Sequence, residues 1–138
     1  MSAEPGGGLL TLGEATLGCG VEAPQRARGI LVRWLDGRFD AQLSEDACLL
    51  VSELVTNSVR HAGQPPGAPV RISAAAGDGL LRVDVEDEGH GEVCRRPADP
   101  DEGGFGLNLV DLLAARWGIS HEHSTRVWFE LTTSIAPA

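Results

Sequence analysis

The longest periodic segment of the chain runs from Leu43 to Ala62 and contains neither glycine nor proline. Ser44, followed by two acidic residues, offers a start signal, and Gly63 with the Pro65-Pro66 pair supplies a stop. The apolar residues recur at helical spacing and fill about half of a helical wheel. These residues are Leu43, Ala47, Cys48, Leu50, Val51, Leu54, Val55, Val59 and Ala62. The pattern predicts an amphipathic helix with one buried face.

Polar residues line the boundary between the buried face of this helix and solvent: Asp46, Glu53, Asn57 and Arg60, with His61 slightly inside it. Polar groups at such a boundary can face a pocket. An alternative interpretation is an ordinary solvated face, on which Glu53, Asn57 and Arg60 make pairs three or four residues apart. Two further segments favour the pocket.

The first segment runs from Leu80 to Gly91, where apolar and polar residues alternate as in a half-buried strand. Asp87 falls on the apolar phase, so its carboxylate is expected to point inward, where it needs a polar partner. Gly89 and Gly91 follow directly, and glycines allow a ligand to approach the backbone closely.

The second segment is the run from Gly103 to Leu107, which includes Gly104, Phe105 and Gly106 and opens another helix. Glycines before a helix leave its first amide groups free, and these groups, at the positive end of the helix dipole, bind phosphate well. Taken alone, the run is also typical of a flexible turn.

The same alternation of apolar and polar positions predicts the remaining elements. Pro24 to Gly37 is typical of a helix with proline in its first turn, and Gly106 to Trp117 of an amphipathic helix ended by Gly118. Further strands are predicted at residues 9–12, 70–74, 119–123 and 127–133, with a hairpin turn at residues 77–79.

Thr125 lies in phase with the apolar residues of the last strand, so its hydroxyl is expected on the inner face. The alternative for Thr125 is a turn hydroxyl that binds its own backbone.

The composition is that of an ordinary globular domain, with 138 residues, of which 42% are hydrophobic and 22% charged. The net charge of −9 argues against nucleic acid or an anionic membrane as a partner. The three cysteines are far apart in the sequence, which predicts reduced thiols and a cytoplasmic location. No apolar run is long enough to span a bilayer, and the N-terminus lacks the features of a signal peptide.

In their order and spacing, these segments resemble the ATP-binding signature of the GHKL superfamily. Glu53 to Ala62 is similar to its asparagine-box helix, Asp87-x-Gly89-x-Gly91 to its first glycine box, and Gly104-x-Gly106-Leu107 to its second. Residues 51–62 and 125–131 resemble most closely the small anti-sigma-factor serine kinases of bacteria. The resemblance covers residues 24–132, which is almost the whole chain.

The resemblance implies a two-layer α/β sandwich, with a mixed, mainly antiparallel sheet and about three helices on one face. Residues 1–138 are expected to form one such domain, with residues 1–8 as a disordered tail. Residues 92–102 correspond to the lid over ATP, and Arg95 and Arg96 are the cations in it.

The resemblance also implies roles for individual residues. Asp87 would accept the adenine amino group, Asn57 would coordinate Mg²⁺, and Glu53 would act as the general base. Thr125 would help to hold the adenine through a water shared with Asp87. The residues that bind the nucleotide would be Asn57, Arg60, His61, Asp87, Gly89, Gly91, Gly104, Phe105, Gly106, Leu107 and Thr125.

The function implied is that of a serine/threonine kinase that phosphorylates an anti-anti-sigma (STAS-type) antagonist, with sequestration of a sigma factor as a second role and a homodimer as the assembly. The alternative is a module that binds ATP and a partner protein without transferring phosphate. The carboxylate of Glu53 favours the enzyme, whereas the short lid with few basic residues favours the module.

Overall fold

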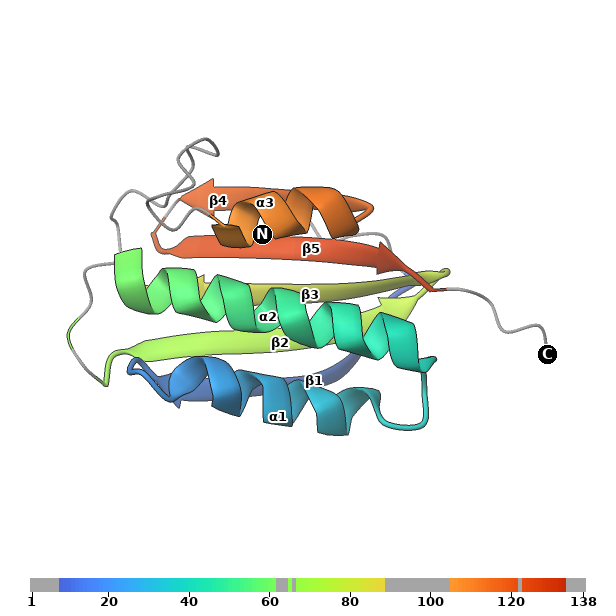
Figure 1. Ribbon diagram of the computed structural model, residues 1–138, viewed down its shortest axis with the longest axis horizontal. Helices are drawn as coiled ribbons and strands as arrows, with labels where there is room; N and C mark the ends of the chain where they lie inside the picture. Colours follow the sequence, from blue (N-terminus) through green and yellow to red (C-terminus); the bar gives the residue numbers. More distant parts are fainter. Residues whose placement is uncertain (1–7, 62–64, 66, 89–104, 122, 134–138) are drawn as a thin grey trace.

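The computed structural model describes residues 8–61, 65, 67–88, 105–121 and 123–133; for residues 61, 105–107 and 121 the description is of the backbone. The elements in chain order are β1 (Leu10–Gly18), α1 (Ala23–Leu35), α2 (Ala41–His61), β2 (Pro69–Gly77), β3 (Leu80–Asp87), α3 (Phe105–Leu113), β4 (Arg116–His121) and β5 (Thr125–Thr132). The strands form one open sheet in the order β1-β2-β3-β5-β4, and the helices cover one face of it (Figure 1).

The predicted two-layer α/β architecture with a mainly antiparallel sheet is confirmed. Every pairing among the described strands is antiparallel, so within this part of the chain the sheet has no parallel component. The core lies between the sheet and the helices: α1 packs on β1 and β2, α2 on β3 and β5, and α3 beside α2 on β4. The opposite face of the sheet, which we call the open face, is covered by none of the described helices (Figure 1).

The central helix α2 forms as predicted, and its apolar arc is buried from Leu43 to Val55. The predicted start at Ser44 is wrong, because α2 begins at Ala41. The backbone amide of Leu43 donates to the Asp40 carboxylate over 2.8 Å, so Asp40 caps the helix.

The first strand is longer than the predicted segment 9–12, since β1 pairs with β2 from Leu10 to Gly18. Its polar and glycine-rich sequence carries little apolar alternation, which is why the pattern missed most of it. A register shift lies between Thr11 and Gly13, and a Cβ at Gly13 would clash with the indole of Trp34 on α1. Glycine therefore allows α1 to approach the edge of the sheet closely.

The predicted hairpin between β2 and β3 is confirmed. Asp78 and Gly79 have φ values of 53° and 76°, and such consecutive positive values are those of a type I′ turn.

The predicted helix from Gly106 to Trp117 is wrong in its last turn. Helix α3 ends at Leu113, and Trp117 and Gly118 belong to β4 rather than to a helix end. The amide of Ala115 donates to the carbonyl of Glu130 over 2.8 Å, so the chain passes directly from α3 into pairing with β5. Pairing with β5 outweighs the helical spacing of the apolar residues.

The last two strands are shifted relative to the predictions: β4 spans Arg116–His121 instead of 119–123, and β5 spans Thr125–Thr132 instead of 127–133. None of the helices in the described residues has the length and hydropathy needed to cross a membrane.

Candidate functional site

Asp87 and Thr125 lie side by side at one end of the sheet, on the face that the helices cover. The register pairs Asp87 at the end of β3 with Thr125 at the start of β5 and with Val70 at the start of β2. Asp87 is 3% exposed and Thr125 4% exposed. Alternation along β3 and β5 puts both side chains inward, as the sequence predicts. A carboxylate and a hydroxyl therefore lie next to each other on the helix-covered face of the sheet, at one end of the core.

Helix α2 brings Glu53 and Asn57 over the sheet. The two residues lie four positions apart, which is about one helical turn, so they share one side of the helix. Asn57 is 9% exposed, and its Nδ2 has no hydrogen-bond partner in the described residues. Glu53 is half-buried. An almost buried amide with an unsatisfied polar atom is costly to the fold, which is typical of a ligand-binding side chain.

Three element ends meet at the same side of the molecule (Figure 1). The carboxyl end of α2, the carboxyl end of β3 and the amino end of α3 all point to the left in that view. Helix α3 begins at Phe105, so Phe105, Gly106 and Leu107 form its first turn. The free amide groups of such a turn carry partial positive charge and suit a phosphate. This side of the molecule thus brings together a buried carboxylate, an amide side chain and the amino end of a helix, a combination that suits a nucleotide.

Some of the predicted site residues remain predictions. Gly89, Gly91, Gly104 and the lid segment 92–102, with Arg95 and Arg96, lie outside the described residues. Arg60 is exposed in the last turn of α2, and His61 ends that helix.

A divalent metal at Asn57 would need ligands in addition to the described side chains. The described residues gather no group of three His, Cys, Asp or Glu side chains that could hold a metal ion. Magnesium suits a site of this kind, because it binds through one or two protein oxygens, phosphate oxygens and water. The amide of Asn57 fits such a site.

Sequence reasoning missed Cys19, which lies near Asp87. Cys19 continues the pairing of β1: its amide donates to Ala68, and its carbonyl accepts from Gly67, both over 2.8 Å. Burial raises the pKa of the Cys19 thiol, and the negative charge of Asp87 raises it further. Burial also raises the pKa of Cys48, against a smaller, lowering effect of Arg28. Both thiols are thus kept in their unreactive protonated form.

A cavity of about 470 Å³ adjoins this end of the sheet. Asp87 contributes to its lining, but so do Arg71, Glu86 and Ser124, and Arg71 and Glu86 lie on the polar phase of their strands. The cavity is therefore on the open-face side of the strand ends, and not on the helix-covered face, where the Asp87 side chain is expected to meet adenine.

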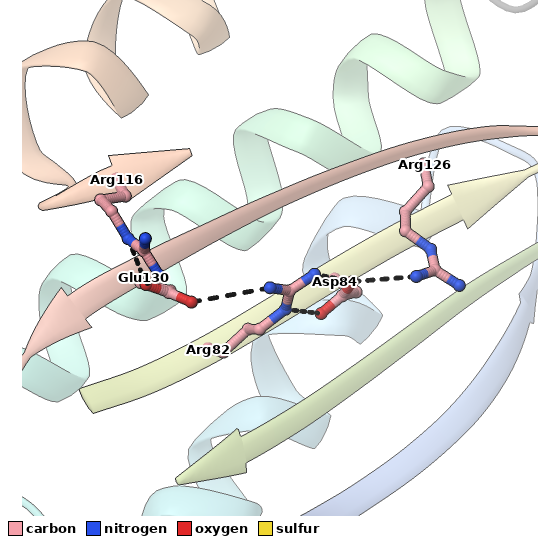
Figure 2. Close-up of polar contacts among 5 residues, drawn as sticks. All are labelled: Arg82, Asp84, Arg116, Arg126 and Glu130. Carbon is pink, nitrogen blue, oxygen red and sulfur yellow. Dashed lines mark hydrogen bonds and ion pairs between the residues drawn. The ribbon is translucent and has the colours of Figure 1, made fainter. Parts of the chain in front are cut away.

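The open face carries a chain of ion pairs that the sequence pattern did not predict (Figure 2). Glu130 is 0% exposed and accepts two hydrogen bonds on Oε1 from Arg116, over 2.8 and 2.7 Å. Glu130 Oε2 makes no hydrogen bond in the described residues, although Arg82 Nη1 lies 3.6 Å away, within ion-pair distance. Arg82 also pairs with Asp84 over 2.9 Å, and Arg126 approaches Asp84 to 3.8 Å.

Arg82 further stacks on Trp128, with its guanidinium carbon 4.3 Å from the ring centroid. The paired strands β3, β4 and β5 are thus tied together across the open face by alternating charges. These contacts explain why a charged residue, Glu130, is buried: it stabilises the fold and does not belong to the candidate site.

The sequence was compared with known proteins. No curated protein matches it. Residues 21–131 match the model of the histidine kinase-like ATPase domain, which covers most of the chain. The match spans α1 to β5 and so includes Glu53, Asn57, Asp87 and Thr125. The chain therefore belongs to the histidine kinase-like ATPase domain family of the GHKL superfamily, and its role is that of an ATP-binding regulatory protein.

Proposed function

We propose that this protein is a cytoplasmic serine/threonine kinase that uses MgATP to phosphorylate a regulatory partner, an antagonist of the anti-anti-sigma (STAS) type, and that it also sequesters a sigma factor. Family membership supports the use of ATP. The observation that best supports kinase activity is the position of Glu53: its half-buried carboxylate lies one helical turn before the nearly buried amide of Asn57.

The nucleotide has a defined place in this proposal. Asp87 accepts the adenine amino group, which selects ATP over GTP because guanine has a carbonyl oxygen at that position. Thr125, opposite Asp87 in the sheet, holds the same edge of the base. We assign phosphate binding to the first turn of α3, to Gly89, Gly91 and Gly104, and to Arg60 and His61 at the end of α2.

Asn57 holds the metal. Bound Mg²⁺ would supply positive charge that stabilises the negative charge developing on the phosphates during transfer.

Glu53 carries the proton transfer. Its carboxylate takes the proton of a serine or threonine hydroxyl on the partner while the hydroxyl oxygen attacks the γ-phosphorus. The bond between that phosphorus and the β,γ-bridging oxygen breaks, and ADP leaves with the bond's electron pair. No other described carboxylate lies one turn from Asn57 on this side of α2.

The partner is expected to contact α1. This helix exposes Arg26, Arg28 and Arg33 in a chain of net charge −9. Val32 of the same helix and Leu49 of α2 are exposed apolar side chains. An acidic partner surface with an apolar centre suits this combination. We also propose that the protein assembles as a homodimer, and light scattering of the purified protein tests this assembly.

The second candidate is a module that binds ATP and its partner without chemistry. The sequence of segment 92–102 favours it, because that segment has Arg95 and Arg96 as its basic residues and four acidic ones. Arginine and lysine commonly stabilise the transferring phosphate in enzymes of this chemistry.

Incubation of the purified protein with radiolabelled ATP and candidate antagonist proteins distinguishes the two functions. If the protein is a kinase, radioactive phosphate should appear on a serine or threonine of the antagonist. An antagonist that binds in the presence of ATP but never acquires label would instead establish the module, and a protein that binds no ATP would overturn both.

A further inference from the structure

The turn between β4 and β5 is attached to β3 by one short hydrogen bond. Ser124 Oγ donates to Glu86 Oε2 over 2.6 Å, between residues 38 positions apart in the chain. Both side chains are partly buried. Glu86 belongs to the polar phase of β3, so the bond lies on the open-face side of the sheet.

Each partner in this bond precedes a residue of the candidate adenine site. Glu86 precedes Asp87, and Ser124 precedes Thr125, which pairs with Asp87 across the sheet. Successive side chains of a strand point to opposite faces. The bond between Ser124 and Glu86 therefore links the end of β3 to the start of β5 on the open face. The side chains that follow, those of Asp87 and Thr125, lie next to each other on the helix-covered face.

The amino end of β5 lies at the margin of both of its strand pairings. Thr125 is the first residue of β5, and its pairings with Asp87 and His121 are the last rungs of their ladders. Strand ends beside turns open more readily than strand centres. The cavity of about 470 Å³ is lined by both Glu86 and Ser124, so on that side the turn borders open space instead of packed side chains. A hydrogen bond to a charged acceptor is stronger than one between neutral groups.

We propose that Ser124 and Glu86 are positioning residues for adenine: their hydrogen bond sets the spacing of Thr125 from Asp87, although neither side chain is on the face that binds the nucleotide. The inference rests on the proposed nucleotide site. It adds a contact on the open face that controls affinity for the base on the helix-covered face.

Calorimetric titration of ATP into single variants tests the inference. Ser124→Ala should weaken ATP binding about five- to tenfold, the equivalent of one ordinary hydrogen bond. Ser124→Thr keeps the hydroxyl and should remain within about twofold of the wild type. Glu86→Gln keeps an acceptor without the charge and should lose about two- to threefold.

Ser73→Ala is the matched control. Ser73 lies on the polar phase of β2, opposite Asp84, and the described residues show no hydrogen bond of its side chain. Its ATP affinity should equal that of the wild type. Thermal melting of each variant without nucleotide identifies any that fails to fold.

A double-mutant cycle with Thr125→Val separates positioning from a general structural effect. If the bond acts through Thr125, Ser124→Ala should change ATP affinity less than about twofold in the Thr125→Val background. An unchanged affinity of Ser124→Ala, or an equal loss in both backgrounds, overturns the inference while leaving the nucleotide site intact. Absence of ATP binding by the wild-type protein overturns the proposed function itself.

Discussion

Asp87 is a carboxylate that the sheet buries almost completely, next to Thr125 and with Cys19 close enough to respond to its charge. We expect Asp87→Asn to weaken ATP binding by about 2 kcal/mol, or about thirtyfold, because the charged acceptor for the adenine amino group is lost. Calorimetry measures this difference. Circular dichroism without nucleotide should show an intact fold, and an unchanged Kd would refute the assignment of Asp87.

Asn57 is expected to act through the metal. Asn57→Ala should weaken nucleotide binding much more in Mg²⁺ than in EDTA, because the lost contact is to the ion. The same substitution should not lower the free energy of unfolding, since it removes a buried amide whose Nδ2 has no partner in the described residues. Equal losses of affinity in both buffers, or a clear loss of stability, would make Asn57 a structural residue.

Cys19 reports on the charge of Asp87. The pKa of its thiol is raised by burial and by Asp87, so Asp87→Asn should lower that pKa and increase the rate of alkylation at mildly alkaline pH. The thiol of Cys48, whose pKa responds to burial and Arg28, should react at an unchanged rate and serves as the control. Mass spectrometry after timed alkylation resolves the two sites. Equal acceleration at both would indicate general loosening of the core.

The raised pKa values also predict how stability depends on pH. In the unfolded chain both thiols lose their protons at the ordinary pKa, whereas the folded protein retains them to higher pH. Their contribution to the free energy of unfolding is therefore complete below the ordinary thiol pKa and is lost as the pH rises above it.

At the scale of elements, the open-face ion pairs hold β4 to β5. Arg116→Ala should lower the free energy of unfolding by about 2 kcal/mol, because it leaves the buried Glu130 without its two hydrogen bonds. Arg126→Ala removes a longer contact to Asp84, of 3.8 Å, and should cost less than about 1 kcal/mol. Urea denaturation measures both, and equal effects would show that burial of Glu130 does not matter.

Periodicity predicted the elements whose apolar residues all face one core. Helix α2 and strand β3 follow this rule, so the inward position of Asp87 could be inferred from alternation alone. The rule fails where pairing decides the structure. Arg116 to Gly118 has helical spacing relative to α3 but pairs with β5, and β1 forms an edge strand with little apolar alternation.

The residues of the candidate site could likewise be predicted only where they follow from the pattern of a single helix or strand. Glu53 and Asn57 follow from one helix, and Asp87 and Thr125 from strand phase. Contacts between distant segments, such as that of Ser124 with Glu86 and the approach of Cys19 to Asp87, depend on a register that no local pattern contains.

At the scale of the whole molecule, the antiparallel order β2-β3-β5 brings the end of β3 beside the start of β5, and α2 runs along the strands on the helix-covered face (Figure 1). Asp87 and Thr125 of the sheet are thereby placed at the same end of the molecule as the carboxyl end of α2, the helix that carries Glu53 and Asn57. The remaining strand pairings and the ion pairs of the open face hold these strands in their register.

The proposed kinase activity is tested most directly by a substitution of Glu53 that affects phosphate transfer but not ATP binding. The measurement is the rate of phosphate transfer from ATP to the antagonist, together with the Kd for ATP, for the wild type and Glu53→Ala. Transfer should fall by about 100-fold or more, the usual contribution of a positioned base, while the Kd changes little. Glu45→Ala, which removes an exposed carboxylate from the same helix, should leave both unchanged. Transfer by Glu53→Ala at the wild-type rate would contradict the account.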